Sequence, residues 1–252
     1  MNIVFYSLIN ADYAVGLLAL LKSLRISNPD IMIPYVVQSA TPLPAQMCAE
    51  MREIYRNIEF RLINPSPYEH CKFSKHRDWQ MNPAYRYEIF RDIEFDQIIY
   101  LDADLLIVQD ISELISFRGA LGACPLPLGE GMELRNIGGF NCGVLSIGRE
   151  ARSPEIWKRL IEVATARSWS GNQTVLNIVL RGFYRALPTR YNVSSTKMTP
   201  EKLQTAAIIH YVGKYKPWHS EQQFGEYQLK MAGKDMCDQL SELWLTYANA
   251  EI

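Results

Sequence analysis

The stretch Ile98–Asp110 reads IIYLDADLLIVQD, in which an apolar run ends in two carboxylates and a second apolar run follows at once. Unpaired carboxylates are costly to bury, so packing alone gives a strand no reason to end in Asp-Ala-Asp. In an extended chain, residues i and i+2 point to the same side, so Asp102 and Asp104 are expected to aim at one point. Carboxylate oxygens suit Mg²⁺ or Mn²⁺. The motif indicates a divalent metal site; two solvated acids at a strand end are the alternative interpretation.

Composition places few limits on the function but excludes several classes. The chain has 252 residues, is 48% hydrophobic and carries a formal net charge of -1, which suits one α/β domain and gives no reason to expect a nucleic-acid partner. Its five cysteines are scattered without a C-x-x-C pair, so we expect neither a zinc site nor a disulfide framework. A cytoplasmic location is the simpler interpretation of unpaired cysteines. No basic region precedes the first apolar residues, and the longest early apolar run, Ala14–Leu21, is too short to span a bilayer.

The first residues predict a strand followed by a helix. Asn2–Leu8 is an apolar run, and Asn10 and Asp12 then open a helix with a regular apolar stripe. This order is typical of nucleotide-binding α/β domains, whose ligands lie at the carboxyl ends of strands. Neither a G-x-G-x-x-G nor a Walker sequence is present. Tyr13 lies at the start of the helix, where it is either a base-stacking residue or an ordinary core or surface tyrosine.

Apolar runs alternate with helical patterns along the rest of the chain. The further predicted strands are Pro34–Gln38, Ile58–Ile63, Ile98–Leu101, Leu121–Cys124, Phe140–Ile147 and Ala207–Val212. The further predicted helices are Ala45–Tyr55, Ala84–Asp92, Ile111–Ile115, Pro154–Ala166, a helix opened by Asn172-Gln173, and a terminal amphipathic helix containing Met236–Tyr247. The alternation favours an α/β fold with a Rossmann-like, mostly parallel central sheet flanked by helices.

Arg86 stands out because it falls on the apolar face of its predicted helix. The apolar residues three, four and seven positions after it are Ile89, Phe90 and Ile93. A guanidinium on a core-facing stripe needs an anionic partner, which the Asp-Ala-Asp turn or a bound phosphate would supply. A surface arginine whose stem covers apolar residues is the alternative.

The segment Asn64–Pro83 contains three prolines and two histidines and has no clean period. A structureless segment of this length in a compact domain is usually functional or mobile. Our hypothesis is a lid over a ligand, with Lys75 and His76 as contacts; a variable surface loop is the alternative.

Polar residues also interrupt two of the later elements. Asn141 and Gly143 lie at the entrance of a predicted strand, where a glycine lets the backbone approach a ligand. Asn172 and Gln173 begin a predicted helix, and Asn177 follows on the same side. The default expectation for Asn172 is helix capping, and contact with a substrate is the alternative.

His210 lies in the last predicted strand, and Gly213 and Lys216 follow it closely. A single histidine in an apolar strand is usually a core residue. Here the histidine can bind a metal, and the lysine that follows the neighbouring glycine can neutralise a phosphate.

Four stretches occur together and in order: Tyr85-Arg86, Leu101-Asp102-Ala103-Asp104, Phe140-Asn141-Cys142-Gly143-Val144 and His210-Tyr211-Val212-Gly213-Lys214-Tyr215-Lys216-Pro217-Trp218. The set resembles family 8 of the retaining glycosyltransferases, which includes glycogenin and bacterial lipopolysaccharide galactosyl- and glucosyltransferases. The Asp-x-Asp alone is unspecific, but with the H-x-x-G-x-x-K-P tail it is highly specific. The resemblance, from Asn2 to about Trp218, implies a GT-A catalytic domain over residues 1–218, with residues 219–252 as a helical extension packed on it.

The resemblance further implies that the chain binds a UDP-sugar through Mn²⁺, with Mg²⁺ as the other candidate. Asp102, Asp104 and His210 would be the metal ligands. In the donor site, Leu8 and Tyr13 would surround the uracil, with Asn10 and Asp12 in the same pocket. Ala103 would lie at the ribose, and Gly213 and Lys216 at the diphosphate. Arg86 and Asn141 would contact the sugar or its phosphates.

One departure from the family concerns the reacting centre. Members usually carry Asp-Gln where this chain has Asn172-Gln173. Asn172 can hydrogen-bond sugar hydroxyls but cannot act as a carboxylate nucleophile or base. We therefore name Asn172, Gln173 and Arg86 as candidate catalytic residues, with the role of Asn172 open.

The leading hypothesis is a retaining glycosyltransferase that moves glucose or galactose from a UDP-sugar to a glycan or lipid-linked saccharide. A catalytically weak UDP-sugar-binding protein with a regulatory or scaffolding role is the alternative, and Asn172 favours it. A nucleotidyltransferase also needs paired acids and a metal. The absence of a Gly-rich phosphate loop and the H-x-x-G-x-x-K-P tail argue against that third class.

Overall fold

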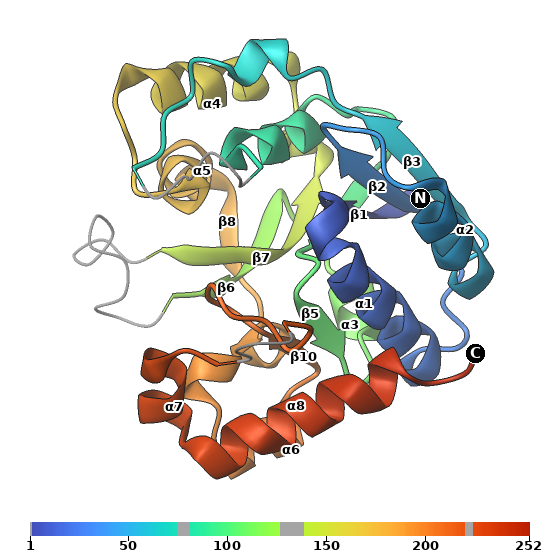
Figure 1. The fold of residues 1–252 in the computed structure, drawn as a ribbon. Coiled ribbons are helices and arrows are strands. Elements are labelled where there is room, and N and C mark those ends of the chain that lie inside the picture. Colours follow the sequence, from blue (N-terminus) through green and yellow to red (C-terminus); the bar gives the residue numbers. More distant parts are fainter. Residues whose placement is uncertain (1, 75–80, 127–138, 220–223) are drawn as a thin grey trace.

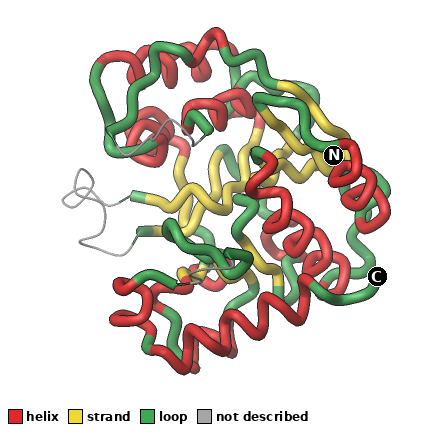
Figure 2. The backbone as a smooth tube through the Cα atoms, in the orientation of Figure 1, coloured by secondary structure: helices red, strands yellow, loops and turns green. Residues whose placement is uncertain are grey.

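The computed structural model describes residues 2–74, 81–126, 139–219 and 224–252. At its centre lies a seven-stranded sheet of order β3-β2-β1-β4-β7-β6-β8, with helices on both faces (Figure 1). Figure 2 shows these strands gathered between two groups of helices. The lid hypothesis for Lys75 and His76 falls on 75–80, outside the described residues.

The large sheet is mostly parallel, as the alternation of strands and helices predicted. Its strands are β1 (Ile3–Leu8), β2 (Tyr35–Ser39), β3 (Ile58–Leu62), β4 (Gln97–Leu101), β6 (Leu121–Pro125), β7 (Phe140–Gly148) and β8 (Tyr184–Ala186). Neighbouring strands pair in parallel except β7, which runs antiparallel to β4 and β6. The prediction of an α/β fold with this kind of sheet is confirmed.

Two groups of helices cover the sheet. The helices are α1 (Ala14–Ser27), α2 (Ala45–Ile54), α3 (Ser112–Ser116), α4 (Pro154–Ala166), α5 (Asn172–Leu180), α6 (Pro200–Thr205), α7 (Glu226–Ala232) and α8 (Lys234–Ala248). Shorter 3-10 segments are η1 (Ala11–Tyr13), η2 (Ser66–Tyr68), η3 (Pro83–Phe90), η4 (Arg149–Ala151), η5 (Arg181–Phe183), η6 (Thr189–Tyr191) and η7 (Ser195–Lys197). The helices α1 and α2 pack on one face, and η3, α4 and α5 pack on the other.

The strand β4 shows how the sheet forms two cores. Ile98 and Tyr100 belong to the apolar cluster with η3, α4 and α5, whereas Ile99 and Leu101 belong to the cluster with α1 and α2. Successive side chains of a strand point to opposite faces, so a strand covered on both sides needs apolar residues at every position. This burial explains the uninterrupted apolar run before Asp102.

A second sheet carries His210, the first residue of the H-x-x-G-x-x-K-P tail. It has the order β5-β10-β9 and consists of β5 (Leu105–Ile107), β10 (Ile208–His210) and β9 (Val193–Ser194). The strand β10 runs antiparallel to β5 and parallel to β9. Leu240 and Trp244 of α8 pack in one cluster with Leu106 and Ile209 of this sheet. In the described ranges, no helix combines the length and apolar character needed to cross a membrane.

The segment around Arg86 differs from the α-helix predicted over Ala84–Asp92. It is the 3-10 helix η3, which ends at Phe90. Side chains three residues apart are eclipsed in such a helix, so Ile89 is buried on the same side as the half-buried Arg86. Ile93 lies beyond the helix end and is 60% exposed. The prediction that Ile93 shares the buried face of Arg86 was therefore wrong.

Candidate functional site

The candidate site lies where the strand order of the large sheet reverses. The chain moves outward from β1 through β2 to β3, and then returns to β4 on the other side of β1. In open α/β sheets, ligands bind outside the carboxyl ends of strands at such a point. Asp102 directly follows β4 at this edge, and Asn10 follows β1.

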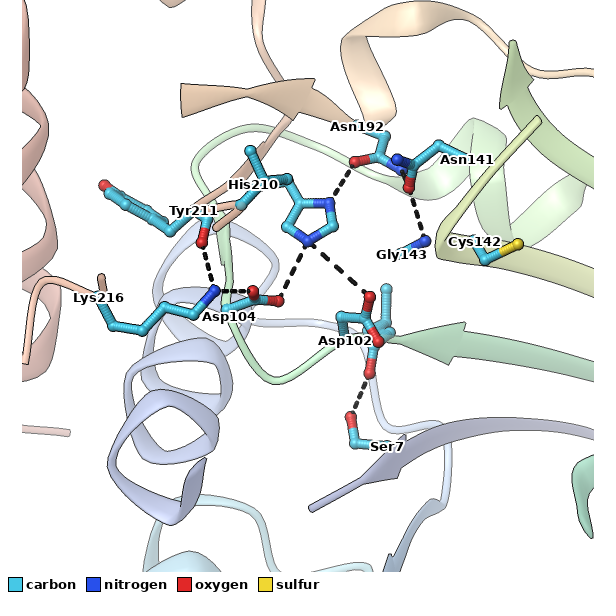
Figure 3. A network of polar contacts seen from close by, with 12 residues as sticks. Ser7, Asp102, Asp104, Asn141, Cys142, Gly143, Asn192, His210, Tyr211 and Lys216 are labelled. Atoms are coloured by element: carbon cyan, nitrogen blue, oxygen red, sulfur yellow. Dashed lines mark hydrogen bonds and ion pairs between the residues drawn. The ribbon is translucent and has the colours of Figure 1, made fainter. Parts of the chain in front are cut away.

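Asp102, Asp104 and His210 converge at this edge, and one ligand atom from each lies within 4.8 Å of the others. Figure 3 shows the imidazole directed at both carboxylates. His210 Nε2 is 3.2 Å from Asp104 Oδ1 and 3.8 Å from Asp102 Oδ2. The pairing of β10 with β5 causes this convergence, because it places His210 opposite Leu105. Two carboxylates and an imidazole form a donor set that suits Mn²⁺, so the residues present fit the expected metal.

The two aspartates meet through a turn, and not through the extended chain that we expected. The strand β4 ends at Leu101, and residues 103–104 form a turn into β5. The backbone N–H of Asp102 donates to Gly143 O at 2.8 Å, after which the chain leaves the large sheet for the small one. The prediction of convergence holds, but its geometric reason was wrong because residues 103–104 turn and do not continue the extended chain.

Lys216 is buried beside Asp104. Its Nζ is 2.5 Å from Asp104 Oδ2 and donates to Tyr211 O at 2.7 Å. Burial alone would raise the pKa of Asp104, but the positive charge of the neighbouring Lys216 opposes this most strongly, and that pKa lies well below its usual range. Burial would likewise lower the pKa of Lys216, and the Asp104 carboxylate reverses this effect and raises it. The buried pair therefore carries one negative and one positive charge.

Arg86 has the anionic partner that its position on an apolar face demanded. Its guanidinium donates to Asp102 Oδ1 and, at 3.1 Å, to Cys142 O. The hydroxyl of Tyr100 donates to the same Asp102 oxygen at 2.8 Å. Within the described ranges, Arg86 Nε is buried without a hydrogen-bond partner. Asp102 is thus held from one side, and its Oδ2 faces His210.

Tyr13 links the end of β1 to the charged cluster. Its backbone N–H donates to Asn10 Oδ1 at 3.2 Å, which fixes the turn before α1. Its ring packs edge-on against Trp218, with 5.8 Å between ring centroids, and Lys216 Nζ lies 5.8 Å from the Tyr13 ring. Tyr13 therefore lies beside both Trp218 and Lys216.

The other residues predicted for the nucleotide surround this turn. Leu8 ends β1 and is buried, whereas Asp12 is exposed. Ala103 is buried, and its carbonyl oxygen lies close to α1 at Gly16. A Cβ at Gly16 would lie 2.6 Å from that oxygen and 2.6 Å from the Trp218 ring. Gly16 thus lets α1 approach the turn between Asp102 and Asp104, a role that the sequence did not reveal.

Asn141 and Gly143 lie at the start of β7, next to Asp102. Gly143 N donates to Asn141 Oδ1 at 2.8 Å. A Cβ at Gly143 would lie 2.4 Å from His210 Cε1 and 2.6 Å from His210 Nδ1. The glycine therefore gives room to the histidine ring, where we had expected room for a ligand.

Gln173 and Asn172 support the same region from α5. Gln173 Oε1 accepts from Cys142 N at 3.2 Å. Asn172 Nδ2 donates to Pro83 O at 3.0 Å, while the residue at the cap position of α5 is Gly171. The prediction that Asn172 caps its helix was wrong, because its amide ties α5 to the segment that carries Arg86.

Gly213 has a φ of +107°, in the left-handed region that favours glycine. A Cβ there would meet nothing closer than 3.8 Å, so the backbone conformation and not space requires glycine. The turn at Gly213 returns the chain from β10 so that Lys216 reaches Asp104.

Sequence reasoning assigned no role to three residues that contact the cluster or Tyr13. They are Tyr100, Trp218 and Asn192, whose Oδ1 lies 2.9 Å from His210 Nδ1. Tyr100 was predicted only as part of a buried strand. Trp218 was given only as the last residue of a family-like stretch. Asn192 carries no signal in its own surroundings, because its place depends on β9 lying beside β10.

Comparison with solved structures identifies this architecture. A mostly parallel sheet with an Asp-x-Asp turn at the reversal of strand order is that of the GT-A glycosyltransferases. The chain superimposes on the galactosyltransferase LgtC in complex with donor and acceptor sugar analogs, with a TM-score of 0.75 and 23% identity over 98% of this chain and 95% of that chain. At this level of identity, the likeness shows a shared fold.

The chain belongs to glycosyl transferase family 8, whose sequence model matches residues 3–222. It is 27% identical to the probable glycosyl transferase Gly of Streptococcus gordonii over 80% of this chain, but it spans 30% of that protein. It is also 26% identical to the lipopolysaccharide 1,2-glucosyltransferase of Escherichia coli over 50% of this chain and 45% of that protein. The chain thus covers less than half of the length of these two relatives.

Gly143→Ala is expected to disrupt the cluster. The added methyl group would overlap the His210 ring, which contacts Asp104 on one edge and Asn192 on the other and so cannot move away freely. Loss of support for a metal ligand typically costs about 10–100-fold in affinity. A Mn²⁺ titration measures the effect. Gly182→Ala is the control, since a Cβ there meets nothing within 4 Å; equal affinity in both variants would contradict the prediction.

Proposed function

We propose that this chain is a retaining hexosyltransferase that transfers glucose or galactose from a UDP-sugar to a glycan or lipid-linked saccharide in the cytoplasm. The observation that carries the proposal is the cluster of Asp102, Asp104 and His210 at the reversal of strand order, with Lys216 and Arg86 at its sides. Membership of family 8 and the GT-A fold support the transfer of a sugar from a nucleotide donor.

The residues of the cluster divide the work between them. Asp102, Asp104 and His210 would hold Mn²⁺ or Mg²⁺, which as a Lewis acid stabilises the negative charge of a leaving diphosphate. Lys216 is a buried cation beside Asp104 and would pair with the diphosphate oxygens. Arg86 already lies between Asp102 and Cys142 O, from which it would contact the sugar or its phosphates. Tyr13 would stack on the uracil.

The relatives indicate the hexose only by their names. LgtC is a galactosyltransferase, and the Escherichia coli relative is a glucosyltransferase. Both sugars are hexoses that differ in the orientation of one hydroxyl group, so a direct comparison of the two UDP-sugars is needed.

The position of Asn172 favours one reaction course. Its amide donates to Pro83 O and offers no carboxylate for a covalent sugar intermediate. A same-face attack by the acceptor, with the leaving phosphate taking the acceptor proton, needs no carboxylate at position 172. We propose this course for the retained configuration of the product.

Isothermal titration of UDP, UDP-glucose and UDP-galactose, with Mn²⁺ and with a chelator, followed by an assay of released UDP, tests the proposal. Metal-dependent binding together with UDP release supports it. Metal-dependent binding without release for any acceptor in a glycan panel would favour the alternative, a UDP-sugar-binding protein with a regulatory or scaffolding role. Absence of uridine-nucleotide binding under all conditions would overturn the proposal.

Asn172→Asp is expected to lower stability without raising turnover. A carboxylate at this position loses the hydrogen bond to Pro83 O and faces a carbonyl oxygen, at a cost of about 1–2 kcal/mol, or a Tm lower by about 4 °C. Thermal melting and UDP release are measured for this variant and for Asn172→Ala, which loses the same bond without adding charge. Faster turnover in the aspartate variant alone would show that the family carboxylate contributes to the reaction.

A further inference from the structure

We propose that Asn192 is a positioning residue that holds the hydrogen of the His210 imidazole on Nδ1, and so leaves Nε2 as the metal-ligating nitrogen. This inference rests on the metal site of the proposed function. It concerns a residue that lies outside the four family-like stretches and that the sequence did not single out.

The hydrogen bonds around Asn192 can be assigned from one fixed donor. The backbone N–H of Gly143 can only donate, and it donates to Asn141 Oδ1 at 2.8 Å. The same oxygen lies 2.7 Å from the Asn192 amide nitrogen, which must therefore be the donor. The other end of the amide, Asn192 Oδ1, faces His210 Nδ1 at 2.9 Å. Figure 3 shows this chain of contacts, Gly143–Asn141–Asn192–His210, on one side of the imidazole.

The chain fixes which nitrogen of His210 carries the hydrogen. An amide oxygen is an acceptor, so Nδ1 must be the donor in this contact. A neutral imidazole carries one ring hydrogen, and Nε2 is then left with its lone pair. Nε2 is the nitrogen directed at Asp104 Oδ1 and Asp102 Oδ2. Hydrogen bonds of this kind orient histidine ligands and select their tautomer in metal sites.

The fold holds Asn192 in place from both sides. Asn192 directly precedes β9, which lies parallel to β10 with Ser194 opposite His210. Its backbone N–H donates to Thr189 O at 3.1 Å. Gly143 adjoins the same edge of the ring, since a Cβ there would lie 2.4 Å from His210 Cε1 and 2.6 Å from His210 Nδ1. The amide and the glycine together thus fix the position of this edge of the imidazole.

Two substitutions distinguish the role of the Asn192 oxygen, which accepts from His210, from that of its amide nitrogen, which donates to Asn141. Asn192→Ala removes both, and we expect Mn²⁺ affinity to fall by about 10–100-fold. Asn192→Asp keeps an oxygen for His210 Nδ1 and should retain Mn²⁺ affinity within about fivefold, since carboxylates commonly support metal-bound histidines. Asn28→Ala is the matched control: it removes a buried amide that bonds Gln109 O and Ile111 N, beyond the far end of β5 from the cluster.

Mn²⁺ affinity is measured without donor sugar, from the electron paramagnetic resonance signal of the free ion, so that no readout depends on activity. Thermal melts establish that each variant is folded. Affinity lost in Asn192→Ala, kept in Asn28→Ala and rescued in Asn192→Asp supports the proposal. Equal affinity of wild type and Asn192→Ala would overturn the role of Asn192 while leaving the proposed function intact. A wild-type chain that binds no Mn²⁺ would overturn both.

The tautomer itself is observable by ¹⁵N NMR of labelled histidines in protein loaded with a diamagnetic divalent ion, because in the metal-free protein the two carboxylates that face Nε2 compete for the ring hydrogen. The chain has four histidines, and a His210→Ala variant assigns the signal of interest. We expect the hydrogen on Nδ1 and the ion on Nε2 in wild type, and a weaker ion-bound signal in Asn192→Ala. A wild-type signal with the hydrogen on Nε2 would overturn the proposal.

Discussion

Asp104→Ala is expected to abolish metal-dependent UDP binding and to lower transferase activity by about 10³-fold, which corresponds to the several kcal/mol that a metal ion supplies to the transition state. Asp104 is the centre of the cluster, because its two oxygens serve different partners. Oδ1 faces His210 Nε2 at 3.2 Å, and Oδ2 pairs with Lys216 at 2.5 Å. The alanine variant loses both contacts together.

Loss of Asp104 also leaves Lys216 as a buried cation whose remaining polar contact among the described residues is Tyr211 O. Breaking a buried ion pair from one side commonly costs about 3–5 kcal/mol of stability. The control must therefore remove a largely buried carboxylate elsewhere. Asp92→Ala does so, since the Asp92 side chain is 10% exposed and pairs with Arg61 at 3.1 Å, away from the cluster.

UDP titration with and without Mn²⁺, together with thermal melting, separates loss of the site from loss of the fold. We expect both variants to melt at lower temperature, but only Asp104→Ala to lose the metal dependence of UDP binding. Asp104→Asn keeps the shape of the side chain and is measured as well, in case the alanine variant does not fold. Normal Mn²⁺-dependent affinity in either Asp104 variant would remove Asp104 from the set of metal ligands.

Lys216→Met is expected to weaken UDP binding by about 10²-fold and to leave uridine binding within about threefold. The lysine is a buried cation next to Asp104, and truncating one side of a desolvated charge contact costs about 2–5 kcal/mol. Uridine has no diphosphate, so it would not detect the loss. Methionine keeps the length of the side chain and its packing beside Tyr13.

Titrations of UDP and uridine in saturating Mn²⁺ measure this difference. Lys22→Met is the control, because Lys22 is also partly buried and donates to carbonyl oxygens of Ala248 and Ala250. It should change neither affinity. An equal loss for UDP and uridine in Lys216→Met would mean that the lysine acts on the fold of the site and does not contact the diphosphate.

Several elements could be predicted from local sequence because local chemistry determines them. The helix α4 begins and ends at the predicted residues, since Ser153 caps it, Pro154 occupies its first position and its apolar stripe has a helical period. The apolar run before Asp102 became β4, and the two acids after it became the edge of the candidate site. Strands were predicted where a short, mainly apolar run had to be buried.

Other elements lacked such a local signal. The strands β8 and β9 contain three and two residues, too few to show a period, and neither was predicted. The segment around Arg86 has a helical pattern, yet it forms a 3-10 helix that ends before Ile93. Asn172 was expected to cap its own helix, but its amide contacts Pro83 instead.

The sequence alone determined the class of fold, the two acids after β4 and the family-like tail from His210 to Trp218. The fold class follows because burial on both faces of a sheet requires apolar residues along each strand. The site follows because carboxylates that interrupt such residues are costly to bury and therefore indicate a binding role. Only the tertiary structure decided that Lys216 pairs with Asp104, that Gly143 makes room for His210, and that Asn192 bonds its ring. These contacts join residues far apart in the chain, and they depend on which strands lie side by side.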